Sequence, residues 1–115
     1  MPRHEELLQE FQLFAQSAAS VETLMERMCQ RLHHELARYN WVGFYLLDPK
    51  DHRYLPGTDM VKSEIVTPVF VKSKFAAELD IESYFANTFG PADQQFVEAC
   101  AALVGKYMDG AGSKP

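Results

Sequence analysis

The sequence predicts an α+β fold in which an antiparallel sheet of about four strands carries helices packed on one face. Apolar residues recur at three- and four-residue intervals near both ends of the chain. The middle instead contains short apolar runs rich in β-branched and aromatic residues. The 115 residues, 47% of them hydrophobic, are enough for one core. We therefore expect a single domain over residues 1–109 and a disordered C-terminal tail over 110–115.

Three helices are expected, two before the strands and one after them. An apolar stripe at helical spacing covers residues 5–19. Ser20 is placed to cap a second helix that runs to about Tyr39. The third helix is expected from Ala92 onward, with Pro91 suited to the first helical position. These helices supply the layer that covers the sheet.

The strands are expected between the second and third helices. Residues 41–47 and 65–71 are apolar on both sides, which predicts that both strands lie in the centre of the sheet. Residues 74–82 alternate between apolar and charged side chains, which is typical of a half-exposed strand in a hairpin with 65–71. A short return strand is expected at 53–55, where Pro56-Gly57 interrupts it as at a sheet edge.

Composition argues against several classes of protein. A net charge of −5 without a basic cluster does not suit a nucleic-acid partner. No apolar stretch is long enough to span a bilayer, and the charged N-terminus does not resemble a signal peptide, so we expect no membrane partner and a cytoplasmic location.

The two cysteines, Cys29 and Cys100, lie inside helical patterns and lack the spacing of zinc or dithiol motifs. We expect buried, reduced thiols. Cys29 and His33 are one helical turn apart, but no further ligand completes a metal site by spacing. We therefore expect no metal, no cofactor and no catalytic residue from these positions.

Four segments carry a specific combination of motifs: NWVGFYLLDP at 40–49, SEIVTPVF at 63–70, AAELDIES at 76–83 and NTFGPADQQFVEA at 87–99. Together they resemble GAF domains, and the closest similarity is to the GAF-type free methionine-(R)-sulfoxide reductases. The resemblance implies the PAS- and profilin-like sheet of that family. It also implies that the helices carrying Cys29 and Cys100 lie side by side, which leaves a redox disulfide as the less favoured alternative.

The sequence departs from this family in the middle of the chain. Members of the family have a further strand, loops and a helix there, which roof the ligand pocket and supply the redox cysteines. Only residues 48–63 fill that interval here, and they contain no cysteine. At about 3.3 Å per extended residue they provide one turn, one short strand and a loop, but no roof. The chain therefore resembles a truncated GAF domain.

The floor of the family's pocket is retained in part. The resemblance assigns substrate-binding aromatic positions to Trp41 and Tyr45, and acidic amine-binding positions to Glu64, Asp80 and Glu82. Spacing agrees, because Trp41 shares a strand face with Tyr45, and Asp80 with Glu82. A tryptophan face beside carboxylates suits a ligand ammonium group. The alternative is that these acids form the solvated side of a half-buried strand.

Two functions follow from these residues. The first is a non-catalytic, minimal GAF-type module for signalling or interaction. It is expected to form a homodimer through surplus apolar residues of its helices, namely Leu7, Phe11, Phe14 and Met25. The alternative is a binder of a small amine, or an enzyme similar to free methionine-(R)-sulfoxide reductase, although its redox cysteines are absent. A cyclic-nucleotide-binding GAF domain is a weaker third option, because such a ligand needs the same roof.

Overall fold

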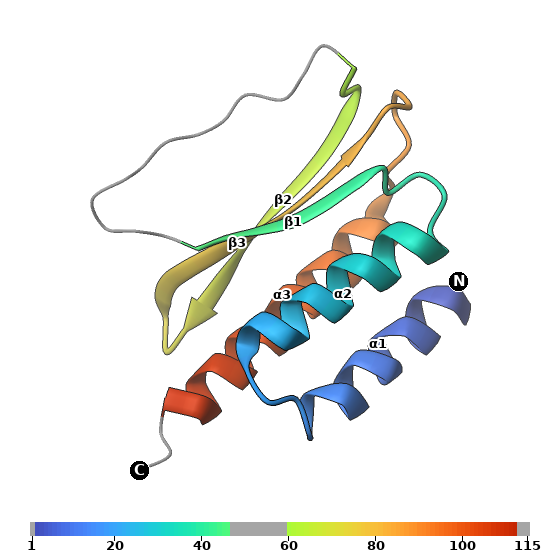
Figure 1. Ribbon diagram of the computed structural model, residues 1–115. Coiled ribbons are helices and arrows are strands. Elements are labelled where there is room, and N and C mark those ends of the chain that lie inside the picture. The colour runs from blue at the N-terminus through green and yellow to red at the C-terminus, as the bar shows by residue number, and fades with distance from the viewer. Residues whose placement is uncertain (1, 47–59, 113–115) are drawn as a thin grey trace.

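The structure, a computed structural model, describes residues 2–46 and 60–112. In these residues the element order is α1 (Pro2–Ala15), α2 (Val21–Glu35), β1 (Trp41–Leu46), β2 (Ser63–Val71), β3 (Lys74–Ser83) and α3 (Pro91–Gly112). All three helices lie on one side of an antiparallel sheet, so the α+β class is confirmed (Figure 1). The described part of the sheet has three strands, and the strand predicted at 53–55 lies outside the described residues. None of the described helices has the length and apolar character required to cross a bilayer.

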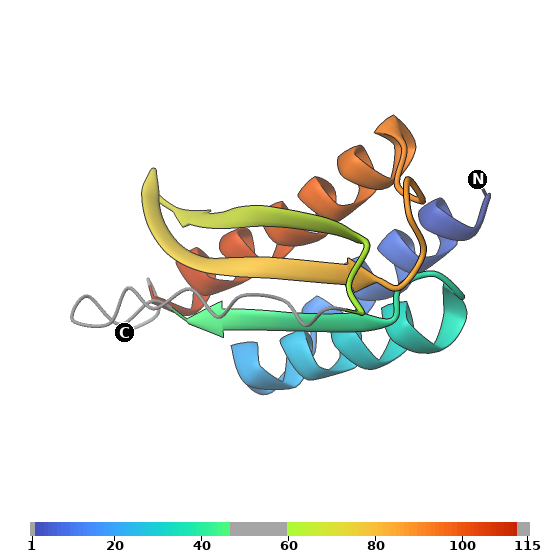
Figure 2. The same cartoon turned by 90° about the horizontal axis from the view of Figure 1, so that it is seen from above.

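The helices form two layers beneath the sheet. α2 packs under β1, and α3 packs mainly under β2, while α1 contacts only the other two helices among the described elements (Figures 1 and 2). The core therefore lies between the sheet and the pair formed by α2 and α3, with α1 closing it from below. Fully buried side chains of the core include Phe11, Leu24, Met28, Leu32, Val69, Leu79, Ile81, Val97, Cys100 and Val104.

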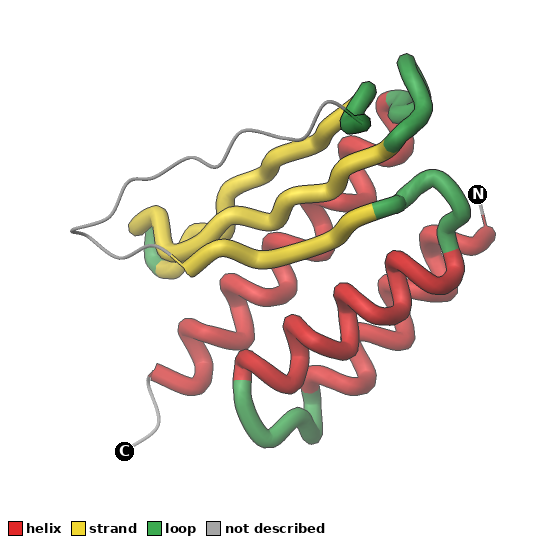
Figure 3. The backbone as a smooth tube through the Cα atoms, turned by 45° about the horizontal axis from the view of Figure 1, so that its top comes forward, coloured by secondary structure: helices red, strands yellow, loops and turns green. Residues whose placement is uncertain are grey.

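The sheet has the order β1-β3-β2, and both pairings are antiparallel (Figure 3). The predicted hairpin of β2 and β3 is confirmed, but the prediction that 65–71 and 41–47 are central strands is wrong for the described sheet, where β3 is central. Burial alternates along β2, with Ile65 and Val69 inside and Val66 and Phe70 outside. Pro68 explains why β2 lies at an edge, because proline has no N–H to donate to a second neighbouring strand.

The turn of the hairpin is tight. Lys72 and Ser73 have φ values of 50° and 68°, so both central residues are in the left-handed region, as in a type I′ turn. This turn matches the twist of the strands but is usually built from Asn-Gly or similar pairs. The Lys72 ammonium lies 3.6 Å from a carboxylate oxygen of Asp109 on α3, which joins the turn to the helix layer.

The helix boundaries confirm some predictions and correct others. Ser20 caps α2, since its hydroxyl accepts a 3.1 Å hydrogen bond from the backbone N–H of Thr23. α2 ends at Glu35, earlier than predicted, because Leu36 is already extended. Pro91 begins α3 as predicted, and α3 runs through residue 112, while residues 113–115 of the predicted tail lie outside the described residues.

The apolar stripe that motivated a dimer is used within the chain. Leu7, Phe11 and Met25 are buried in the core, and Phe14 is partly buried with the Arg27 guanidinium 4.4 Å from its ring centre. The expectation that these side chains form a surplus of exposed apolar surface is therefore wrong, because they pack α1 on α2 and α3. The homodimer itself stays a prediction. Leu13, 68% exposed, is the one large apolar side chain of the described helices that is mostly exposed.

Gly105 on α3 allows the close approach of the helix to β2. A Cβ atom at this position would lie 2.4 Å from the backbone oxygen of Phe70. We expect Gly105→Ala to lower the free energy of unfolding by about 1–3 kcal/mol through overpacking, although alanine is the better helix former. Urea denaturation measures this change.

Gly110→Ala is the matched control on the same helix, because an added Cβ there meets nothing within 4 Å. Its stability should stay within about 1 kcal/mol of the parent protein or rise slightly. Equal effects of the two substitutions would contradict the packing of α3 on β2.

Candidate ligand-binding site

The predicted site residues lie on the sheet face turned away from the helices, which we call the open face. On β3, Leu79 and Ile81 are buried against the helices, so the alternating Asp80 and Glu82 lie on the opposite side. Glu82 is paired with Glu64 on β2 and with Trp41 on β1. The register therefore brings residues from three strands to one place.

Glu64, Asp80 and Glu82 form what we call the acidic triad. One carboxylate oxygen from each lies within 4.8 Å of the others. Glu64 is exposed and Glu82 is half-buried, but Asp80 is only 5% exposed. Its Oδ1 atom is buried without a hydrogen-bond partner in the part of the chain that the structure describes. The alternative that these acids are simply a solvated strand face is therefore wrong for Asp80. The reason is the central position of β3, which places a neighbouring strand on each side of Asp80.

The environment of Asp80 favours its neutral form. Burial raises its pKa to about 8, with further contributions from the hydrogen bond to Glu82 and from the negative charges of Glu64 and Glu82. The triad therefore holds a proton near neutral pH, and a cationic ligand can take the place of that proton.

An aromatic pair flanks the triad on β1. Trp41 and Tyr45 share a face as predicted, and their rings stack with centres 5.8 Å apart at 24°. Each remains more than one third exposed, at 39% and 38%. Gly43, between them, is a site residue that sequence reasoning missed. A Cβ atom there would lie 2.3 Å from Trp41 Cη2, so the indole lies directly over this glycine.

Asn40 fixes the start of β1 against the end of β3, and it too was not predicted from the sequence. Its backbone N–H donates a 2.9 Å hydrogen bond to the carbonyl oxygen of Glu82. Its side-chain oxygen accepts a 2.8 Å hydrogen bond from the backbone N–H of Tyr84. Because Trp41 follows Asn40 directly, these bonds hold the aromatic and acidic parts of the site in one register. The feature of the sequence that could have identified Asn40 is a polar residue directly before an apolar strand.

The cysteines lie away from this site. Cys29 on α2 is half-buried and Cys100 on α3 is fully buried, and both are free thiols. Burial raises the pKa of Cys29 to about 11 and that of Cys100 to about 12. Both therefore favour the unreactive thiol form, on helices that cover the opposite face of the sheet. His33 Nδ1–H donates a 2.9 Å hydrogen bond to the backbone oxygen of Tyr39, which joins α2 to the segment that follows it.

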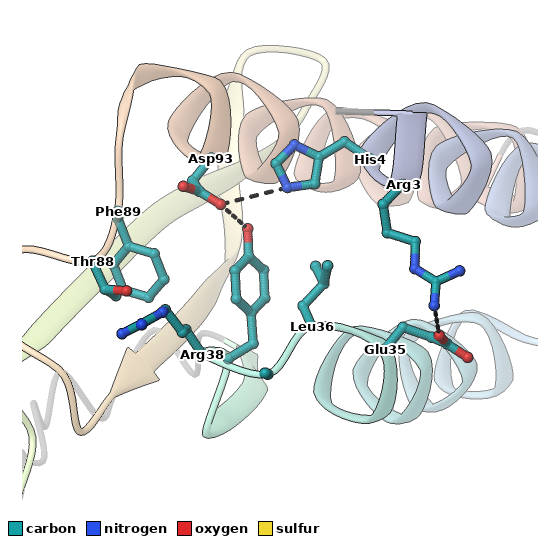
Figure 4. A pocket seen from close by; sticks show the side chains of 10 residues that line it. Arg3, His4, Glu35, Leu36, Arg38, Thr88, Phe89 and Asp93 are labelled. Atoms are coloured by element: carbon teal, nitrogen blue, oxygen red, sulfur yellow. Dashed lines mark hydrogen bonds and ion pairs between the residues drawn. The ribbon is translucent and has the colours of Figure 1, made fainter.

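A cavity of about 610 Å³ lies on the helix side near the start of α1 and α3 (Figure 4). Asp93 accepts hydrogen bonds there from the Tyr39 hydroxyl at 2.7 Å and from the backbone N–H of Gly90 at 3.1 Å. His4 Nε2 lies 3.5 Å from the same carboxylate, although burial lowers the pKa of His4. These groups satisfy one another and join α1 to the start of α3, so we assign the cluster a structural role.

The raised pKa of Asp80 predicts how stability depends on pH. The folded protein keeps a proton that the unfolded chain loses near the ordinary aspartate value of 3.8, so stability should fall as pH rises from about 4 to 8. Asp80→Asn removes this loss, and we expect it to be more stable than the parent protein by on the order of 1–3 kcal/mol at pH 8, with a smaller difference at pH 5. Urea denaturation across this range measures both slopes. Glu78→Gln, a change on β3 outside the triad, should keep the parental dependence of the free energy of unfolding on pH. If Asp80→Asn also kept the parental dependence, its assignment to Asp80 would be contradicted.

The position of the indole over Gly43 gives a second prediction. Gly43→Ala should displace the ring, since the colliding atoms belong to a side chain that can move away. Trp41 is the only tryptophan, so its fluorescence should shift toward that of a more exposed indole while the free energy of unfolding changes by less than about 1.5 kcal/mol. An unchanged emission spectrum in Gly43→Ala would show that the ring does not depend on this glycine.

No protein-family model matches this sequence, and no curated protein matches it either. Solved structures do match. The free methionine-R-sulfoxide reductase of Neisseria meningitidis, solved with its substrate, has a TM-score of 0.84 at 15% identity over 95% of this chain and 90% of that chain. The Staphylococcus aureus fRMsr, also in complex with substrate, has a TM-score of 0.78 at 20% identity over 91% and 95% of the two chains.

A third structure, titled as the GAF domain, has a TM-score of 0.71 at 18% identity over 90% of this chain and 88% of that chain. The predicted loss of the pocket roof concerns residues 48–63, most of which lie outside the described residues. The described helices and strands nevertheless agree with all three structures. This chain has a GAF-like fold, and that fold is close to the one seen in the free methionine-R-sulfoxide reductases.

Proposed function

We propose that this protein is a non-catalytic GAF module that binds a small organic ammonium compound on the open face of its sheet. The observation that carries the proposal is the stacked pair of Trp41 and Tyr45 beside the acidic triad. Aromatic faces and convergent carboxylates are the two kinds of group that recognise an ammonium ion.

The chemistry of the site suits a cation. An ammonium group offers several N–H donors, and Asp80 Oδ1 is a buried acceptor without a hydrogen-bond partner among the described residues. Binding would replace the proton that the triad holds and would reduce the repulsion among three nearby carboxyl groups. The exposed edge of Trp41 then covers the apolar part of the ligand.

The class of ligand is suggested by the structural relatives. Two of them are named free methionine-R-sulfoxide reductases and were solved with their substrates. A free amino acid that carries a sulfoxide combines an ammonium group with a short, weakly polar side chain. Free methionine-(R)-sulfoxide is therefore the first ligand to test.

Reduction of such a ligand needs a reactive thiolate next to the sulfoxide. The sequence contains two cysteines, and both lie on the helices with raised pKa values. This argument favours binding without turnover. The alternative, a reductase-like enzyme, requires that Cys29 or Cys100 reach the open face from the other side of the sheet.

The test is a titration of free methionine-(R)-sulfoxide that follows Trp41 fluorescence, with turnover assayed in the same sample under dithiothreitol or thioredoxin. We expect saturable quenching without turnover, and no response to N-acetyl-methionine-(R)-sulfoxide, which lacks the ammonium group. Asp80→Asn should weaken binding at least about tenfold, because a charge-assisted hydrogen bond is lost. Glu78→Gln, which changes a neighbouring charge outside the triad, should bind as the parent does.

Two results would contradict the proposal. Turnover would establish the reductase-like alternative. The absence of a saturable response to methionine-(R)-sulfoxide, methionine or lysine up to millimolar concentrations would exclude an ammonium site.

A further inference from the structure

We propose that the acidic triad is also a site for a hard divalent cation such as Ca²⁺, which competes with an organic ammonium ligand for the same carboxylates. The site consists of Glu64 on β2 with Asp80 and Glu82 on β3. This inference goes beyond amine binding, because it needs the three carboxylates but neither of the aromatic rings.

The geometry of the triad fits one metal ion. Two oxygens on opposite sides of a Ca²⁺ ion are about 4.8 Å apart, because each Ca–O bond is about 2.4 Å long. Each carboxylate of the triad offers an oxygen within 4.8 Å of the other two. All three can therefore belong to one coordination sphere without a change in the backbone.

Asp80 supplies a second, independent observation. Asp80 is only 5% exposed, and within residues 2–46 and 60–112 its Oδ1 atom has no hydrogen-bond partner although it belongs to a strongly polar group. A buried acceptor of this kind normally has a partner, and leaving it without one costs about 1–3 kcal/mol. A cation within the triad would provide that partner.

The strand register supports the same conclusion. Glu64 and Glu82 are directly opposite each other in the β2–β3 pairing, where like charges destabilise a sheet. Asp80 adds a third carboxyl group two residues along the central strand. This arrangement lowers the stability of the empty site, and a bound cation would offset that cost.

The donor set selects the kind of metal. All three donors are carboxylate oxygens, and among the described residues no histidine or cysteine joins them. Oxygen ligands favour Ca²⁺, Mg²⁺ or Mn²⁺ over Zn²⁺ or Cu²⁺. We expect Ca²⁺ to bind more tightly than Mg²⁺, which requires near-ideal octahedral geometry at about 2.1 Å.

Sequence spacing did not predict this site, because Glu64 is sixteen residues from Asp80 and meets it only through the antiparallel register. The expectation of no metal rested on the cysteines and histidines, which are not part of the triad.

Luminescence of Tb³⁺, a substitute for Ca²⁺, is a direct test. Trp41, the only tryptophan, is paired with Glu82 and should transfer energy to an ion in the triad. We expect saturable Tb³⁺ emission on tryptophan excitation, which Ca²⁺ reverses. Asp80→Asn and Glu64→Gln should each weaken Tb³⁺ binding at least tenfold, whereas Glu78→Gln should leave it within about twofold of the parent protein.

Calorimetry separates this inference from the proposed function. Trp41→Leu should abolish the binding of methionine-(R)-sulfoxide but leave the affinity for Ca²⁺ unchanged within about threefold, because the ring is not a metal ligand. In the parent protein, Ca²⁺ should raise the apparent dissociation constant of the amine ligand.

Different results would overturn the metal site and the amine-binding proposal. Absence of both Tb³⁺ emission and Ca²⁺ binding heat in the folded parent protein would overturn the metal site, whatever the amine titration shows. So would emission that is unaffected in both Asp80→Asn and Glu64→Gln, since the ion would then lie elsewhere. Circular dichroism of each variant establishes that it is folded. Ca²⁺ binding without any amine binding would support the metal site and reject the amine proposal.

Discussion

The central position of β3 is the constraint on which the rest of the structure depends. One side of this strand, with Leu79 and Ile81, packs against the core between the sheet and the helices. The other side holds Asp80 between Gly43 of β1 and Val66 of β2. The flanking strands remove water from Asp80, and this burial raises its pKa to about 8, well above that of an exposed aspartate. The same pairing that completes the core therefore creates the electrostatic character of the open face.

The two faces of the sheet have different physical roles. The helix side is filled by apolar side chains, and the polar groups around Asp93 satisfy one another there. The thiols of Cys29 and Cys100 lie on this side in a form that resists ionisation. The open face carries the acidic triad and the stacked pair of Trp41 and Tyr45. The sheet thus lies between the carboxyl groups of the triad and the two thiols.

Much of the fold and part of the site could be predicted from the sequence, because periodicity and capping are local properties. Ser20 and Pro91 marked helix starts, and the alternation along 74–82 marked a strand with one buried side. Strand order could not be predicted in this way, because it depends on which strands pair over long separations. Pro68 was a usable signal for an edge strand, but the apolar run around it outweighed that signal. The burial of Asp80 and the contact of Trp41 with Gly43 depend on neighbours in other strands, so no local pattern contained them.

Pro68 also restricts how this protein can associate with other chains. A strand at the edge of a sheet normally offers a continuous row of N–H and C=O groups to which another strand can add. Along β2, an edge of the described sheet, that row is interrupted at Pro68, which has no N–H. Proline on an edge strand discourages edge-to-edge aggregation. This edge of the described sheet is therefore less open to strand addition by another chain than an uninterrupted edge would be.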